Sequence, residues 1–384
     1  MLNFLSQNKP SPIGLDIGHE SIKMLQLAMI GHRLTAVASA RWQFPDNVAG
    51  DAALRRRFAV DAVRELLNSG GFRGRQVITC LGSEEMTIKQ VRMPRMSDRE
   101  LQSALQWEAN ERFGYKLEPD QLNYAVAGEV RQGADVCDEV ILMGARKETI
   151  DDHLAMLEEM KLYPMAIDAE PICLFRSFER FLRRRKDVTC VTVLVDIGIS
   201  ATRVIIARGR QVAFIKSIGV GGRQFNQVVS EWLNLSIDEA AQLRMRLMRG
   251  GEAPETTSNA TTGEQIRQAV YDAMRSTVEE LAREIALCLR YYAVTFRGAK
   301  ADIVTLAGGE VYDPCLRELL NEYLNIQCQA GQPLKGMDLS LVDLGADRRG
   351  MLSEWAIAAG LALRNTQTNL HAQERANEPD RLSA

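Results

Sequence analysis

One short motif occurs twice in this chain of 384 residues. The segment Gly14–Gly18 reads Gly-Leu-Asp-Ile-Gly, and Leu194–Gly198 reads Leu-Val-Asp-Ile-Gly. Each Asp follows an apolar stretch typical of a β-strand, and each motif leads through a second apolar stretch to another glycine turn. A late apolar run, Val304–Gly309, ends in a Gly-Gly pair. This repetition predicts two related halves, each with a strand–turn–strand hairpin, around a nucleotide cleft.

The two motifs share a second feature, a cation seven residues after the aspartate: Lys23 follows Asp16, and Arg203 follows Asp196. A tight glycine turn directs backbone N–H groups into a concavity that binds oxyanions, and it lets a phosphate approach the backbone closely. An aspartate beside such a turn is suited to hold a hydrated Mg²⁺ that bridges to phosphate. We therefore interpret both aspartates as Mg²⁺-positioning residues that act through water. The alternative is that each only initiates a turn.

Further segments extend the pattern and point to a family. The chain resembles the superfamily of actin and the sugar kinases, in which two phosphate loops and an adenosine loop occur in this order. Within it, the chain is similar to the PilM family of type IV pilus assembly proteins, which are relatives of the cell-division protein FtsA. The resemblance runs from Ser11 to Arg364 and rests on the first phosphate loop Gly14–Leu27, Leu101–Glu108, Asp168–Pro171, the second phosphate loop Leu194–Gly222, the adenosine loop Thr305–Glu310, and Trp355–Arg364.

The resemblance implies the fold. We expect an α/β chain with the actin-like, ribonuclease H-like arrangement: two lobes built on duplicated mixed sheets, with an inserted subdomain of the type called 1C. The expected division is residues 11–93 with 163–188 for the first lobe, 94–162 for the inserted subdomain, 189–230 with 300–364 for the second lobe, 231–299 for a helical subdomain, and 365–384 for a polar, disordered tail.

The resemblance also implies a set of site residues. ATP or ADP with Mg²⁺ is the expected ligand, and Glu170 is expected to orient the attacking water, although a helix-capping role is an equal alternative. Glu284 is expected to reach the ribose or base, and its alternative is a solvent-exposed position. The expected nucleotide contacts are Gly18, His19, Glu20, Ser21, Lys23, Gly198, Gly222, Glu284, Gly308, Gly309 and Glu310.

Several residues depart from the family pattern. His19 and Glu20 stand where small hydroxyl residues are usual, and a carboxylate at a phosphate loop repels a triphosphate unless it points away. In the third loop, Val311 and Tyr312 stand where smaller residues are common. These departures affect hydrolysis more than binding, so we expect ATP binding with slow or absent hydrolysis.

The inserted subdomain concentrates aromatic residues in a chain that is only 6% aromatic. Trp107, Phe113, Tyr115 and Tyr124 lie there, and such residues anchor interfaces but equally build small cores. The resemblance implies that this subdomain and the neighbouring lobe hold a short N-terminal cytoplasmic peptide of the bitopic inner-membrane protein PilN. We take Trp107, Phe113 and Tyr124 as candidate partner contacts.

Composition limits the other functions. A formal net charge of −3 gives no general argument for nucleic acid, and we expect none as a partner. Seven cysteines without a CxxC pair are typical of a reducing cytoplasm. No run reaches the roughly 18–20 apolar residues that span a bilayer, so we expect attachment to the inner face of the inner membrane only through a partner.

The sequence therefore predicts a cytoplasmic, actin-like ATP-binding scaffold that docks on PilN and couples the membrane platform to the pilus motor. Motor ATPases, the platform protein and a second copy of the chain are further expected partners. Two alternatives stay open. One is an FtsA-like filament former, which usually ends in an amphipathic helix that residues 365–384 do not resemble. The other is a sugar or acetate kinase-like phosphotransferase, for which no suitable general base stands in a motif.

Overall fold

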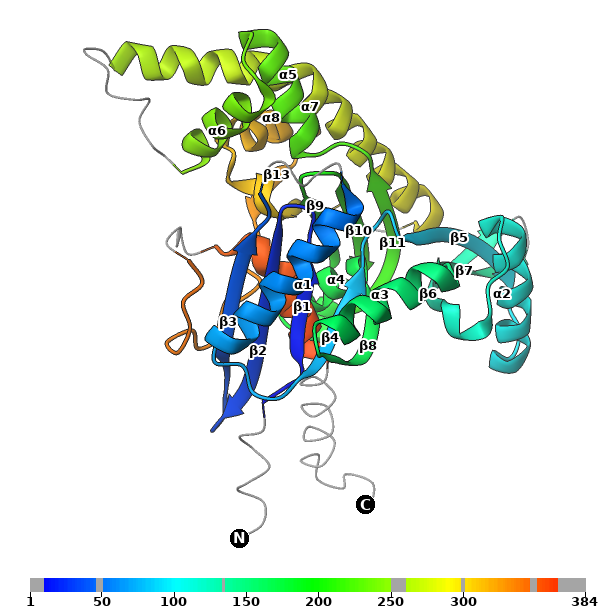
Figure 1. Ribbon diagram of the computed structural model, residues 1–384. Helices are drawn as coiled ribbons and strands as arrows, with labels where there is room; N and C mark the ends of the chain where they lie inside the picture. The colour runs from blue at the N-terminus through cyan, green and yellow to red at the C-terminus, as the bar shows by residue number, and fades with distance from the viewer. Residues whose placement is uncertain are drawn as a thin grey trace. The chain divides into compact units, whose positions relative to one another are not determined.

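The computed structural model describes residues 10–45, 51–132, 135–249, 260–297, 301–345 and 351–364. The chain divides into two compact units (Figure 1). Unit 1 is drawn from Met1–Gly82, Glu148–Phe178 and Pro333–Ala384, and unit 2 from Ser83–Lys147 and Glu179–Gln332. Each unit is built on a five-stranded mixed sheet, and unit 2 also carries a three-stranded sheet.

The sheet of unit 1 has the strand order β3-β2-β1-β4-β8. Its first three strands form an antiparallel meander, and β4 and β8 then continue in parallel from β1. The bounds are β1 (Ile13–Ile17), β2 (Ser21–Ile30), β3 (Arg33–Gln43), β4 (Gln76–Leu81) and β8 (Tyr163–Ala169).

Helices cover both faces of this sheet, because its strands are apolar on both sides. On one face, α1 (Ala52–Ser69) and α3 (Lys147–Glu159) pack on β1 and β2, and Figure 1 shows α1 in front of the sheet. On the other face lie α4 (Glu170–Glu179) and a helical segment at residues 356–364. A Cβ at Gly14 would lie 2.6 Å from the Ala358 oxygen, so this strand position needs glycine where the helix crosses it.

The five-stranded sheet of unit 2 repeats the same topology, with the order β11-β10-β9-β12-β13. Its strands are β9 (Val191–Ile197), β10 (Thr202–Arg208), β11 (Gln211–Ile218), β12 (Ile303–Ala307) and β13 (Gln327–Ala330). One continuous core joins it to α5 (Gly222–Leu233), α6 (Ile237–Met248), α7 (Ala260–Phe296) and α8 (Pro314–Leu324).

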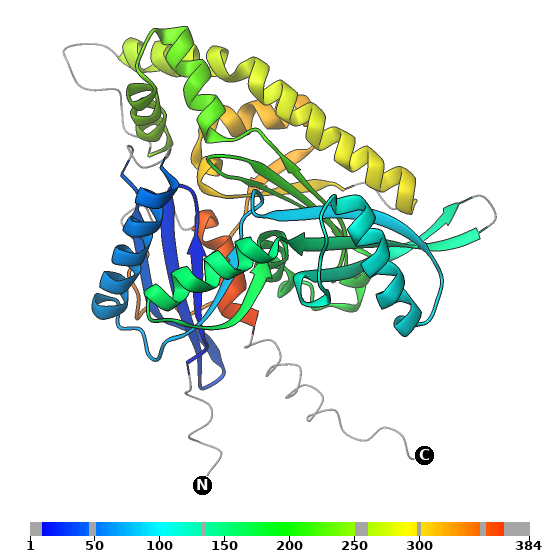
Figure 2. The ribbon, with the colours of Figure 1, turned by 45° about the vertical axis from the view of Figure 1, so that its right-hand side comes forward.

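The second sheet of unit 2 is an antiparallel insertion with the order β5-β7-β6. Figure 2 shows α2 (Asp98–Phe113) beside β5 (Met86–Pro94), β6 (Leu122–Gln132) and β7 (Asp135–Ala145). Leu101, Leu105 and Ala109 recur at every fourth position of α2 and pack on the sheet. β6 also contacts β11, and Tyr291 of α7 donates a hydrogen bond of 2.7 Å to Glu139 of β7, so the insertion is fixed within unit 2.

Several segments lie elsewhere than the expected domain division places them. Most of α3 was expected in the inserted subdomain at residues 94–162, but it belongs to unit 1 and packs on β1 and β2. β5 falls largely within the expected first lobe, but it pairs along its whole length with β7 of the insertion. Residues 333–364 were expected in the second lobe, but Leu334, Met337 and Trp355 pack on Leu25 and Leu27 of β2 in unit 1. In each of these cases the pairing or burial is with a strand far away in sequence. The expected tail at residues 365–384 lies outside the described residues.

Short 3-10 turns complete the described structure: η2 (Pro119–Gln121), η3 (Arg185–Thr189), η4 (Gly309–Tyr312) and η5 (Ser353–Trp355). Within the described ranges, every helix is either too short or too polar to cross a bilayer.

Candidate functional site

The first repeated motif forms the hairpin of β1 and β2 in unit 1. Asp16 lies directly across from Lys23 in the antiparallel register, which explains the spacing of seven residues. The Lys23 ammonium is 3.5 Å from the Asp16 carboxylate, and both side chains are buried. Gly18 closes the turn by donating its N–H to the Ser21 oxygen at 3.0 Å. His19 and Glu20, at the tip, are exposed, whereas Ser21 is buried.

The second motif forms the corresponding hairpin of β9 and β10 in unit 2. Asp196 lies across from Arg203, and the guanidinium donates a hydrogen bond of 2.8 Å to the buried carboxylate. Gly198 donates to the Ala201 oxygen at 3.1 Å, as Gly18 does in the first turn. Arg203 is held further by its Nε, which donates to the Ser83 hydroxyl at 2.9 Å. An aspartate, a basic residue across from it and a glycine turn therefore occupy equivalent positions in the two hairpins.

An arginine that the motifs do not contain supports the first turn. Arg55 of α1 donates to the Gly18 and His19 carbonyl oxygens at 2.6 and 2.8 Å, and it stacks on the Phe44 ring at 4.0 Å. Because a trans peptide is planar, its N–H points opposite to its C=O. The N–H groups of His19 and Glu20 therefore point away from Arg55 in the same general sense, as in an anion-binding nest.

Three glycine turns of unit 2 meet at the carboxyl ends of β9 and β12. Gly222, at the start of α5, donates its N–H to the Gly198 oxygen at 3.0 Å. Gly308 follows β12 with a φ of 93°, which disfavours any residue with a Cβ. A Cβ there would clash with the Ile197 oxygen and lie 2.9 Å from the Asp196 carboxylate. Ligands of open α/β sheets bind at this end of the strands.

Glu310 of the third loop belongs to a buried ion cluster. Its carboxylate accepts a hydrogen bond of 2.6 Å from Arg244 of α6, which is only 1% exposed. Asp313, the N-cap of α8, accepts from the same guanidinium at 2.7 Å. Burial lowers the pKa of Arg244, but the two carboxylates outweigh burial and raise the pKa above its usual value, so the arginine stays charged.

The other two expected site acids lie in different surroundings. Glu170 is the first residue of α4 in unit 1 and is buried. It lies within electrostatic range of Cys80, whose pKa is raised by a hydrogen bond with Cys173, by burial, and by charges that include Glu170 and Asp16. Glu284 of α7 in unit 2 is partly exposed and accepts a hydrogen bond of 2.7 Å from Lys216.

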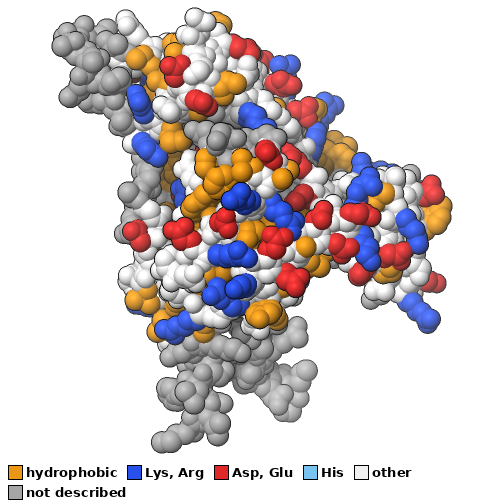
Figure 3. Space-filling view, in the orientation of Figure 1, with side chains coloured by type: hydrophobic (Ala, Val, Ile, Leu, Met, Phe, Trp, Pro, Cys, Tyr) orange, Lys and Arg blue, Asp and Glu red, His pale blue; other side chains and the backbone are white. Residues whose placement is uncertain are grey.

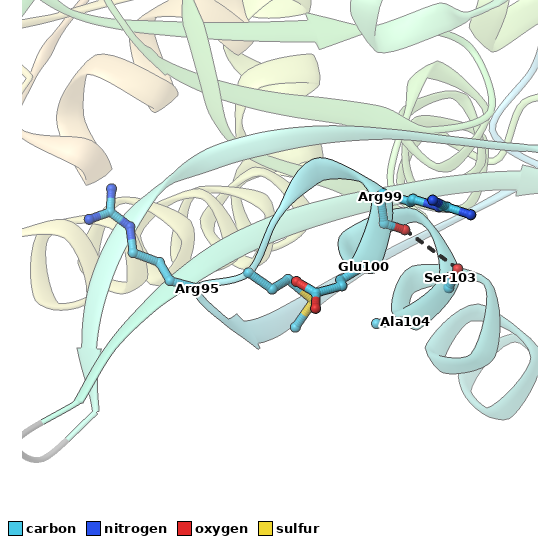
Figure 4. A pocket seen from close by; sticks show the side chains of 6 residues that line it. Arg95, Arg99, Glu100, Ser103 and Ala104 are labelled. Carbon is cyan, nitrogen blue, oxygen red and sulfur yellow. Dashed lines mark hydrogen bonds between the residues drawn. The ribbon is translucent and has the colours of Figure 1, made fainter.

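The three candidate partner residues have different environments in the insertion. Trp107 of α2 is 66% exposed, Phe113 packs in the core of the insertion, and Tyr124 is partly buried against that core. Near the start of α2 lies an open pocket, where Figure 4 shows Arg95 and Arg99 extending to opposite sides of Glu100. The lining residues are Arg95, Met96, Arg99, Glu100, Ser103 and Ala104.

The carboxylates of the two hairpins are suited to Mg²⁺ that is already bound to phosphate oxygens. Within the described residues, no group of three or more His, Cys, Asp or Glu side chains is placed to hold a metal ion by itself. Each hairpin instead offers one buried carboxylate beside a glycine turn. Mg²⁺ commonly keeps several waters and takes one or two protein carboxylates together with phosphate oxygens. Each of these aspartates, Asp16 in unit 1 and Asp196 in unit 2, therefore has the chemistry to hold a water of a hydrated Mg²⁺ that is bound to phosphate.

Two arginines that contact the glycine loops could not be identified from the motifs. Arg55 and Arg244 both lie on helices, in runs of arginines whose pattern fits a solvated helix face. The separations Arg55–His19 and Arg244–Glu310 span 36 and 66 positions, so no local pattern contains them. The local sign that this part of α6 faces a core is the pair of apolar residues near Arg244, which are Leu243 and Leu247.

Comparisons with known proteins identify the family and the fold of the chain. The family model for type IV pilus assembly protein PilM matches residues 14–366. A solved PilM–PilN type IV pilus biogenesis complex superposes with a TM-score of 0.72 at 23% identity, covering 92% of this chain and 98% of that chain. The ethanolamine utilization protein EutJ from Carboxydothermus hydrogenoformans gives a TM-score of 0.54 at 12% identity, over 92% of this chain and 89% of that one.

These likenesses confirm the predicted actin-like α/β fold with duplicated mixed sheets. The family match covers nearly the whole described chain, including both hairpins, the insertion and the third loop. The chain belongs to the family of type IV pilus assembly protein PilM.

Proposed function

We propose that this chain is a cytoplasmic, ATP-binding scaffold of type IV pilus assembly. It docks on the cytoplasmic N-terminal peptide of a PilN-like inner-membrane protein, and it links the membrane platform to the pilus motor. Membership of the PilM family supports the pilus role. The similar solved structure is a complex of PilM with PilN, which supports a PilN-like partner. In this proposal the chain reaches the inner membrane through that partner.

The observation that carries the ATP-binding part is the duplicated pair of a buried aspartate and a cation beside a glycine turn. Asp16 and Asp196 would hold the waters of Mg²⁺, and bound Mg²⁺ would offset the negative charge of the phosphates. Lys23 and the N–H groups that Arg55 directs would contact phosphate oxygens in unit 1. In unit 2 the Gly198 turn and Gly309 would do so, because a Cβ added at Gly309 meets no atom within 4 Å.

Hydrolysis is slow or absent in this proposal. Glu170 is the residue proposed to orient a water, and its buried position at the start of α4 suits a fixed carboxylate. His19 and Glu20 occupy the exposed tip of the first turn. The Glu20 carboxylate repels a bound polyphosphate when it turns inward, which weakens the close alignment that in-line attack needs.

The proposed docking surface for the partner peptide is the outer face of α2. Arg99, Ser103 and Trp107 recur at every fourth position, opposite the residues that pack on the sheet, and all three are exposed. Figure 3 shows positive and negative side chains interspersed over this insertion. Ion pairs of the insertion include Arg95–Glu129 and Arg112–Glu108. The aromatic anchor would therefore contribute more to affinity than a single-sign charge field.

A matched pair of tryptophans tests the docking surface. Trp107 and Trp232 are 66% and 65% exposed, and they lie on α2 and α5 of the same unit. The Trp107→Ala variant of the full chain is expected to bind a synthetic PilN-like N-terminal peptide at least about thirtyfold more weakly, because hot-spot truncations cost about 2 kcal/mol or more. Trp232→Ala is expected to bind it as wild type does. Fluorescence anisotropy of the labelled peptide measures both, and equal affinities would move the docking site away from α2.

A further inference from the structure

A basic segment between α4 and β9 takes no part in the proposed nucleotide site or docking surface. The sequence Arg180–Lys186 contains five basic residues and no acid, in a chain with a formal net charge of −3. It leads into η3 and belongs to unit 2. Arg183 and Arg184 are exposed, and so are two apolar side chains of the same stretch, Phe181 at 41% and Val188 at 68%. Cations and exposed apolar groups therefore lie together in one short stretch.

The turn between β10 and β11 adds two arginines to this surface. Gly209 of the turn donates its N–H to the Cys190 carbonyl oxygen at 2.8 Å. A Cβ built on Gly209 would lie 2.5 Å from the Val188 carbonyl oxygen, so the turn packs closely on η3. Arg208 and Arg210, on either side of Gly209, are exposed. We call residues 179–190 and 208–210 together the basic surface.

The acids of the basic surface neutralise only part of its charge. Arg210 pairs with Glu179 at 2.9 Å, and Arg184 pairs with Asp187 at 3.4 Å. Asp187 is buried, and it also accepts the backbone N–H of Arg184 at 2.8 Å. Seven basic residues and two acids leave the basic surface with a formal charge of +5. A surface of this sign attracts an anionic partner.

We propose that the basic surface binds the anionic headgroups of a phospholipid bilayer directly. This contact is additional to the proposed function, in which the chain reaches the membrane through a protein partner. Each basic residue near an anionic leaflet strengthens binding about fivefold, and the attraction fades beyond a Debye length. Phe181 and Val188 suit the same partner, because apolar side chains on a cationic surface can enter the boundary between headgroups and acyl chains.

The exposed apolar pair favours a lipid surface over a nucleic acid. Cations supply the phosphate contacts to a nucleic acid, and aromatic rings contribute there by stacking on bases. The Arg180 guanidinium already covers one face of the Phe181 ring, 4.4 Å from the ring centre, and Val188 has no ring to stack. A surface of this size gives reversible membrane binding, which adds to the affinity that the protein partner supplies.

Vesicle sedimentation of the full chain tests this proposal. The chain is expected to bind vesicles of phosphatidylcholine with about 30% phosphatidylglycerol at low ionic strength, and to be released when the salt is raised to about 1 M. Vesicles of phosphatidylcholine alone are expected not to bind it. Equal binding to the two kinds of vesicle, or binding to neither, would overturn the proposal and leave the proposed function intact.

A pair of double variants tests whether the basic surface makes the contact. Arg183→Gln with Arg208→Gln removes two exposed cations and is expected to weaken binding to the anionic vesicles about 25-fold. Arg246→Gln with Arg249→Gln removes the same charge from exposed positions of α6 and is the control. Arg208 pairs with the start of β9, whereas α6 contacts Gly222 near the end of this strand, which is about 20 Å long. An equal loss in both double variants would show that only the total charge matters and would overturn the proposal.

The Val188→Ser variant separates a lipid surface from a nucleic acid, because it keeps every charge. It is expected to weaken vesicle binding about threefold, since a small apolar group no longer leaves water. Unchanged vesicle binding by this variant, or tighter binding of a labelled DNA duplex than of the anionic vesicles at equal phosphate concentration, would overturn the proposal. Thermal unfolding establishes whether the variants are folded, and for any that is not, the two vesicle compositions and the duplex decide with the wild-type chain.

Discussion

The two hairpins have the same strands, register and charges, but different supports. In unit 1 the Asp16–Lys23 pair is 3.5 Å apart, and Arg55 holds the turn through two backbone carbonyls at the protein surface. In unit 2 the Asp196–Arg203 pair is 2.8 Å apart, and Gly308 of the third loop packs on the aspartate. The paired aspartate and cation are thus the common feature, and the residues that hold each turn come from elsewhere in the unit.

This difference in support predicts that the two turns tolerate substitutions differently. The first turn is held by hydrogen bonds from the Arg55 side chain to main-chain carbonyl oxygens, so the side chains at its tip can vary without loss of these two bonds. The second turn is linked to the buried Arg244 through Gly222, which donates to the Gly198 oxygen and accepts from the Arg244 guanidinium. We therefore expect unit 2 to be the more sensitive of the two to substitution at its ion pairs.

The largest expected effect is on Arg244. Arg244→Met leaves two buried carboxylates without their cation, and breaking a buried ion pair costs about 3–5 kcal/mol of unfolding free energy. Arg246→Met, two positions away on the exposed side of α6, is the control and is expected to change it by less than about 0.5 kcal/mol. Urea unfolding measures both, and equal stabilities would show that the cluster is not what holds the third loop.

The next largest effect is a loss of folding stability at acidic pH that comes from His153 in unit 1. Burial, with a smaller contribution from Arg56, lowers the pKa of His153 from 6.5 to about 4. The unfolded chain therefore binds more protons between these values, and stability falls as the pH drops from 6.5 to 4, by up to about 3 kcal/mol.

His153→Gln serves as the control for this dependence, because glutamine does not titrate and still offers a hydrogen-bonding group near the Thr79 hydroxyl, which lies 3.3 Å from the His153 ring. Urea unfolding at pH 7 and pH 4.5 is expected to show a smaller pH-dependent loss in the variant than in the wild type. An identical loss in both proteins would assign the acid sensitivity to other groups.

The smallest expected effect is the difference in coupling energy between the two hairpin ion pairs. Double-mutant cycles with Asp16→Asn and Lys23→Met, and with Asp196→Asn and Arg203→Met, measure the coupling within each hairpin. The shorter, hydrogen-bonded pair of unit 2 is expected to couple by about 1.5–3 kcal/mol and the 3.5 Å pair of unit 1 by about 1 kcal/mol. A stronger coupling in unit 1 would reverse the comparison between the units.

The sequence predicts the parts of this molecule whose signals are local. The duplicated motif, the spacing from Asp16 to Lys23 and the late Gly308–Gly309 pair are enough to indicate two related sheets with a glycine turn at each hairpin. These features are local because an antiparallel hairpin fixes which residues face each other.

Features that depend on distant partners were harder to predict. The sequence of β5 indicates a strand but not its partner, and only the pairing with β7 assigns it to the insertion. Arg244 and Arg55 follow charged, helix-like patterns, and their buried or main-chain contacts depend on how helices pack on loops far away in sequence. Phe113 and Trp107 lie six positions apart in one helix, and their opposite environments follow from which face of α2 meets the sheet.

The most direct test of the proposed nucleotide site is calorimetric titration of the full chain with Mg²⁺-ATP. Wild type is expected to show one saturable site, and Asp16→Asn and Asp196→Asn are each expected to weaken it by about 1–3 kcal/mol, the value of a charge-assisted hydrogen bond. Asp61→Asn, at an exposed position of α1, is the control and should bind as wild type does. Absence of saturable binding in the folded wild type, or undiminished binding in both hairpin variants, would contradict the assignment of these hairpins as phosphate loops.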